Sequence, residues 1–61
     1  MELAEAIADL PEEQRAAIEL HHLKGCALAD VAAQMGRSTA SVAGLVRRGL
    51  VRLRAKLDPE G

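Results

Sequence analysis

The sequence predicts an all-α fold, a small four-helix domain with a helix-turn-helix and a long last helix. Apolar residues recur at helical spacing through nearly the whole chain. Pro11, Gly25 and Gly36 interrupt this spacing where one helix would end and the next begin. Because the chain has only 61 residues, we expect residues 1–61 to form a single domain. The helices are expected at about 2–9, 11–24, 28–35 and 38–57.

The first two predicted helices meet at Pro11. Proline is favourable at the first position of a helix, where its missing N–H is not needed. Glu12 and Glu13 would follow in the first turn, where the helix dipole favours acidic side chains. Gly25 would end the second helix in a left-handed cap. The residues expected in the core are Leu3, Ala6, Ile7 and Leu10 in and just after the first helix and Ala17, Ile18, Leu20 and Leu23 in the second.

The third predicted helix is short and ends at Gly36. Its expected core residues are Val31, Ala32 and Met35. Ala27 stands where a capping Ser or Thr would be expected, which weakens the start of this helix by about 1 kcal/mol.

The fourth predicted helix is amphipathic and about 30 Å long. Ser38 would cap it, because a hydroxyl accepts hydrogen bonds from the exposed N–H groups of the first turn. Asp58, Pro59 and Gly61 would terminate it. The expected apolar stripe is Val42, Leu45, Val46, Leu50, Leu53 and Leu57, and the opposite face holds Ala40, Ser41, Ala43, Gly44, Arg47, Arg48, Val51 and Arg54.

Formal charge is divided between the two halves of the chain. Residues 1–30 carry seven acidic and two basic side chains (−5), whereas residues 31–61 carry six basic and two acidic ones (+4). Such asymmetry indicates a face for an anionic partner. The chain has no aromatic side chain on which bases could stack, so a nucleic-acid partner would be a duplex. Arg52, Arg54 and Lys56 are also expected from the helix dipole alone.

The start of the fourth predicted helix has the properties of a recognition helix. Its small side chains would let it enter the major groove of DNA, which is about 12 Å wide. Its N–H groups and hydroxyls could hold a phosphate, and the arginines that follow could reach phosphates or a guanine edge. The same small residues would also allow close packing against a protein. The candidate DNA-binding residues are Arg37, Ser38, Thr39, Ser41, Ala43, Gly44, Arg47 and Arg48.

The sequence contains no pattern typical of a catalytic or metal-binding site. His21, His22 and Cys26 are close along the chain, but adjacent histidines diverge by about 100° on a helix. A zinc site needs three or four ligands. We therefore expect no metal, no cofactor and no enzymatic activity, and we expect Cys26 to fill a turn as a small apolar residue. A single cysteine, without a signal peptide or a membrane span, favours a cytoplasmic setting.

A series of short motifs follows these elements. They are Leu10-Pro11-Glu12-Glu13-Gln14-Arg15, Leu23-Lys24-Gly25, Asp30-Val31-Ala32, Met35-Gly36-Arg37-Ser38, Val42, Arg47-Arg48-Gly49-Leu50 and Arg52-Leu53-Arg54. In combination they resemble region 4 of bacterial sigma factors, in particular the extracytoplasmic-function class, from Leu3 to Leu57.

This resemblance implies a four-helix domain that acts in transcription initiation. It would read the −35 element of promoter DNA and dock on the flap of the RNA polymerase β subunit. In many members an anti-sigma factor masks this domain. Region 2, which melts the promoter, has no counterpart in the sequence, so we expect the chain to be a domain excised from a longer protein.

The chain departs from the family pattern early in the fourth helix. The family usually has Lys or Arg at the positions of Ala43 and Leu45, and commonly Ser at Gly44. Of the usual DNA-facing positions, only Arg47 and Arg48 keep strong donors. Each lost phosphate contact weakens binding, so we expect the isolated domain to bind DNA no more tightly than about 10⁻⁴ to 10⁻⁶ M.

Two alternative functions stay open on the sequence. One is a free-standing helix-turn-helix regulator output domain, which would dimerise through its last helix. The other is a protein-interaction domain with weak DNA binding, favoured by the loss of basic residues at Ala43 and Leu45.

Overall fold

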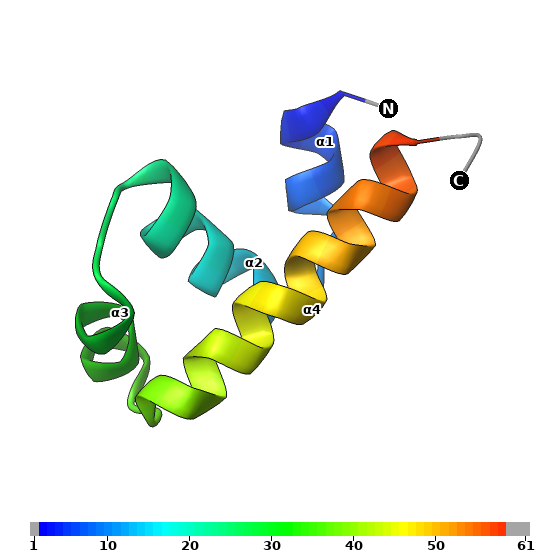
Figure 1. Cartoon of the computed structure of the whole chain (residues 1–61). Helices are drawn as coiled ribbons and strands as arrows, with labels where there is room; N and C mark the ends of the chain where they lie inside the picture. Colours follow the sequence, from blue (N-terminus) through cyan, green and yellow to red (C-terminus); the bar gives the residue numbers. More distant parts are fainter. Residues whose placement is uncertain (1, 59–61) are drawn as a thin grey trace.

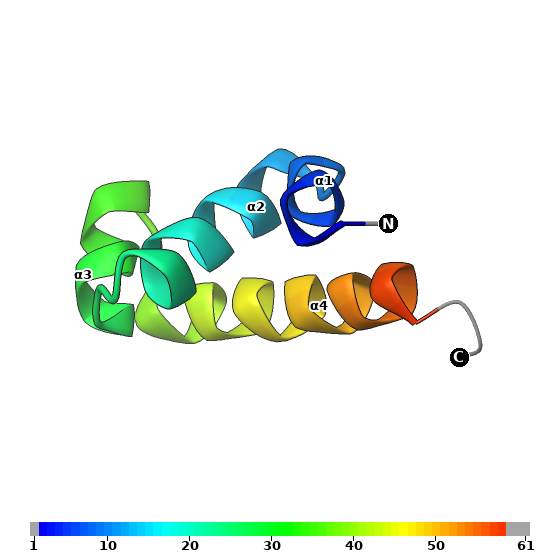
Figure 2. The same ribbon diagram turned by 90° about the horizontal axis from the view of Figure 1, so that it is seen from above.

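The computed structural model describes residues 2–58, and its long last helix, α4 (Thr39–Leu57), is the element on which the others pack. Before it come α1 (Leu3–Ala8), α2 (Glu12–Ile18), the π-helical turn η1 (Glu19–Leu23) and α3 (Leu28–Met35). Figure 1 shows α1 beside the C-terminal end of α4 and α3 beside its N-terminal end. Figure 2 shows α1 and α2 along the same side of α4. The described part of the chain contains no strand, and the all-α prediction is confirmed.

Local signals account for most of the helix boundaries. Gly25 and Gly36 adopt the left-handed conformation, with φ of 74° and 67°, as expected of C-terminal caps. After α3, the N–H of Arg37 donates to the carbonyl of Ala32 at 2.9 Å, which completes a Schellman cap around Gly36. Pro11 caps α2 from an extended conformation, so the helix begins at Glu12, one residue later than predicted. Ala27 provides no side-chain cap for α3, as expected.

The second helix ends in a π-helical turn that the sequence did not predict. The N–H of Lys24 donates to the carbonyl of Glu19, five residues earlier, at 3.0 Å. A turn closed this way holds more residues than an α-turn, and it therefore rotates the side chains that follow. Leu23, expected in the core, is consequently 60% exposed, whereas Leu20 stays half-buried against the core.

The core consists of two clusters along α4. The cluster at the helix-turn-helix end contains Ala17, Val31, Ala32, Val42, Leu45 and Val46, with Leu20, Cys26, Leu28 and Met35 packed against it. The cluster beside α1 contains Ala6, Ile7, Leu10, Ile18 and Leu53. Cys26 thus fills the turn between η1 and α3, as predicted.

Three further leucines expected in the core are exposed. Leu3 is 50% and Leu57 is 39% exposed, because each lies in a terminal turn with packing partners on one side only. Leu50 is 41% exposed because it faces the groove described below. Pro59 and Gly61, expected to terminate α4, lie outside the described residues. Among the described helices, none has both the length and the apolar character needed to cross a membrane.

Candidate nucleic-acid interface and adjacent groove

The first turns of α4 present a narrow, exposed face. The Ser38 hydroxyl accepts a hydrogen bond from the Ser41 N–H at 3.1 Å, so the predicted cap is confirmed. Thr39, Ala40 and Ala43 are exposed, and none of them projects far from the backbone. This face therefore has the slim profile that a major groove requires.

Arg37, a candidate DNA-binding residue, is engaged within the fold. Its Nε donates to Glu13 Oε2 at 2.9 Å, and its Nη2 contacts the same oxygen. Its Nη1 donates to the Ser41 hydroxyl at 2.9 Å. Arg37 thus links α2 to the turn before α4. Contact of Arg37 with DNA stays a prediction, and it would require the guanidinium to leave Glu13.

Four exposed arginines of α4 form the basic face of the domain: Arg47, Arg48, Arg52 and Arg54. Within residues 2–58, none of their guanidinium groups makes a hydrogen bond or an ion pair. The sequence singled out Arg47 and Arg48, whereas Arg52 and Arg54 were attributed mainly to the helix dipole. The structure leaves all four guanidinium groups free to meet an anionic partner.

The remaining basic residue of α4, Lys56, forms an ion pair within the domain. Lys56 Nζ donates to Asp9 Oδ2 at 2.6 Å, which ties the end of α4 to the end of α1. This hydrogen bond and the positive charge of Lys56 lower the pKa of the Asp9 carboxyl from its ordinary value of 3.8. The ion pairs Lys56–Asp9 and Arg37–Glu13 both join the acidic first half of the chain to the basic second half.

The positions at which the sequence departs from the sigma pattern fall in different environments. Ala43 is exposed, so a basic side chain there would reach solvent. Leu45 is only 6% exposed and belongs to the core. At Gly44, an added Cβ would lie 3.6 Å from Nη2 of Arg48, an ordinary contact. The donor missing at position 43 is therefore a surface change, whereas Leu45 is a packing residue.

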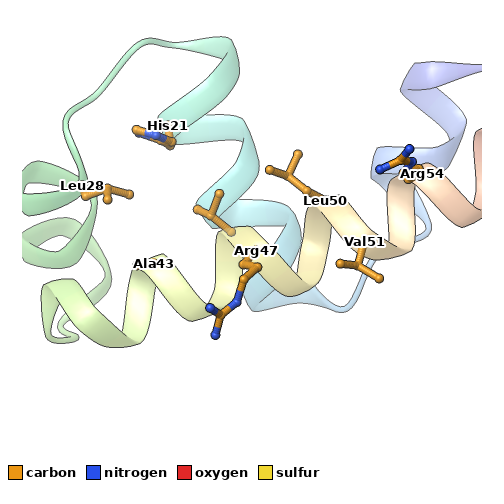
Figure 3. Close-up of a pocket in the computed structure, with 8 residues that line it drawn as sticks. His21, Leu28, Ala43, Arg47, Leu50, Val51 and Arg54 are labelled. Carbon is orange, nitrogen blue, oxygen red and sulfur yellow. The ribbon is translucent and has the colours of Figure 1, made fainter.

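An apolar groove of about 330 Å³ lies between η1, α3 and the middle of α4. Figure 3 shows the side chains that line it. They are His21, Leu28, Ala43, Val46, Arg47, Leu50, Val51 and Arg54. Sequence reasoning missed this groove, since it assigned Leu50 to the core. Ala43 and Arg47, predicted to face DNA, lie where the groove meets the basic face.

The family model described as "Sigma-70, region 4" matches residues 1–53, which include every element up to the last turn of α4. The chain belongs to the sigma-70 region 4 family. Region 4 is a non-enzymatic helix-turn-helix domain through which sigma factors bind promoter DNA and RNA polymerase in transcription initiation. No curated protein and no solved structure matches this region 4 domain. No group of three or more potential metal ligands occurs within the described part of the domain.

Proposed function

We propose that this domain reads the −35 element of a promoter with the first turns of α4 and docks the polymerase β flap in the adjacent groove. The observation that carries this proposal is that one helix of a sigma region 4 domain presents two chemically different surfaces. One is basic and lined by small residues, and the other is apolar.

The basic surface suits duplex DNA. The capped start of α4, with its exposed small residues, can enter the major groove, while Arg47 and Arg48 lie two turns farther along. Neither arginine has an acidic partner within the described residues that would have to be displaced. Because few donors precede them, we expect weak binding dominated by phosphate contacts and by the methyl groups of Thr39 and Ala43.

Fluorescence anisotropy with a labelled −35 duplex at several salt concentrations tests this assignment. Arg48→Ala should weaken binding and reduce the slope of log K against log[salt] by about 0.9, the value for one phosphate contact. Lys24→Ala is the matched control, because it removes the same charge from an exposed position outside α4. An Arg48→Ala domain with unchanged affinity and slope would show that Arg48 does not contact a phosphate.

The groove suits a protein segment rather than DNA. Its centre is apolar, with Leu50 41% and Val51 65% exposed, and a polyanion gains nothing from such a surface. Arg47 and Arg54 at its edge would attract acidic groups that flank an apolar partner segment. We assign the β flap to it, since RNA polymerase is the protein partner of this family.

Amide chemical shifts of the isotope-labelled domain, titrated with a β-flap fragment, test this assignment. We expect saturable shifts confined to the groove. Leu50→Gln should weaken flap binding, because it places an amide where the apolar partner packs. Leu3→Gln is the control, since Leu3 has a similar exposure but belongs to α1 and does not line the groove. Flat shifts in a folded domain would contradict the assignment.

A protein-interaction domain with weak DNA binding is the second candidate, and the exposed apolar groove favours it. The two candidates differ in salt dependence. A complex held by the groove should survive high salt, whereas DNA binding should fade as salt rises. An anti-sigma factor, if one masks this domain in the cytoplasm, would have to cover the groove or the basic face.

A further inference from the structure

His21 is the one polar side chain other than arginine among the residues that line the groove. Leu28, Val46 and Leu50 are among the apolar side chains that line the groove with it, and Arg47 and Arg54 supply charge. Figure 3 shows the imidazole projecting from the turn η1 above Leu28. Its position depends on the π-helical turn, a feature that often marks functional sites in helices.

A hydrogen bond to the backbone fixes the tautomer of His21. Its Nδ1 lies 2.8 Å from the carbonyl oxygen of Cys26, in the turn that follows η1. A carbonyl oxygen can only accept, so Nδ1 must carry a proton. In the neutral ring, Nε2 is therefore the unprotonated nitrogen, with a lone pair that no described residue uses. A residue that lines the groove thus has one hydrogen-bond acceptor in a fixed orientation.

We propose that His21 is the specificity-determining residue of this groove: its Nε2 accepts a hydrogen bond from an N–H or O–H group on the polymerase segment that docks there. This inference rests on the proposed function for the identity of the occupant. A segment that packs on Leu50 without such a donor would bury the His21 lone pair unpaired, and this would disfavour it.

Two measurements test the proposal. The first is a long-range ¹H–¹⁵N spectrum of the imidazole side chains in the free domain at pH 8. We expect the Nδ1–H tautomer for His21. The Nε2–H tautomer would overturn the proposal, whatever binds in the groove.

The second is the affinity for a β-flap fragment at pH 8. We expect His21→Leu to bind the fragment about fivefold or more weakly than the wild type, because a donor on the partner is left unpaired. His22→Leu, at an exposed neighbour whose described contact is an edge-on packing against His21, should bind as the wild type does. Circular dichroism melting verifies that both variants fold.

The outcomes separate the two proposals. A wild-type domain that fails to bind the flap would overturn the proposed function, and this inference with it. Flap binding of equal affinity in the wild type and in His21→Leu would overturn the inference alone.

Discussion

Replacing Gly44 or Gly49 of α4 with alanine should change the stability of the domain in opposite directions. An alanine in the middle of a helix is favoured over glycine by about 0.5–1 kcal/mol, because glycine loses more backbone entropy on folding. At Gly44 the new Cβ would meet only the side chain of Arg48, at 3.6 Å. At Gly49 it would lie 3.0 Å from Cγ1 and Cδ1 of Ile18.

The close contact with Ile18 decides how much Gly49→Ala changes the stability of the domain. Ile18 is only 2% exposed and packs among residues of α1 and α4, so it has little room to move away from an added methyl group. Overpacking of this kind costs about 1–3 kcal/mol, more than the gain in helix propensity. We therefore expect Gly49→Ala to destabilise the domain by about 1 kcal/mol, and Gly44→Ala to stabilise it by about 0.5–1 kcal/mol.

Thermal melting followed by circular dichroism at 222 nm measures both effects, since the chain has no aromatic fluorophore. In a domain of this size, 1 kcal/mol shifts Tm by about 4–8 °C. The Gly49→Ala domain should melt below the wild type and the Gly44→Ala domain above it. Equal stabilisation by both substitutions would refute the reasoning, because it would mean that α2 does not approach α4 closely at Gly49.

Three further predictions follow from the packing and the charges. Leu53→Ala should cost about 2–5 kcal/mol through a cavity in the cluster beside α1, and a variant of unchanged stability in urea denaturation would place that cluster elsewhere. Asp9→Asn should lower stability at pH 7, because Lys56 lowers the pKa of the native Asp9 carboxyl and so stabilises the fold. This stabilisation is present above the unfolded pKa of about 4 and is lost as pH falls through the native pKa. The melting temperatures of the wild type and the variant should therefore converge in acid. Ala43→Lys should steepen the slope of log K against log[salt] for DNA binding by about 0.9, at little cost in stability. Leu45→Lys should unfold the domain, because it buries a charge. Equal melting temperatures for the two variants would contradict the assigned faces.

The helix boundaries were predictable because their signals are local. Gly25 and Gly36 adopt left-handed conformations, and the Ser38 hydroxyl reaches an amide three residues away. The π-helical turn had no such signal, so the exposure of Leu23 could not be read from apolar spacing, which assumes an unbroken α-helix. Leu50 was misplaced for a related reason: periodicity gives a face, but not whether another element covers it.

The candidate site was predictable to a similar degree. The slim, capped start of α4 and its arginines could be read from residue types and their spacing. The pairing of Arg37 with Glu13 could not, because it joins residues 24 positions apart and depends on how α2 docks against the turn. The hydrogen bond between His21 and the Cys26 carbonyl likewise depends on a backbone path that residue types do not specify.

The unbroken course of α4 has a consequence for promoter geometry. Ser38 caps the helix, and Arg48 and Leu50 follow on the same rigid rod, in which each residue adds about 1.5 Å of rise and 100° of rotation. If DNA and polymerase dock as proposed, the repeat of this helix sets their relative orientation about its axis, because no hinge separates the two surfaces. The domain would then present the −35 element to polymerase at one fixed angle.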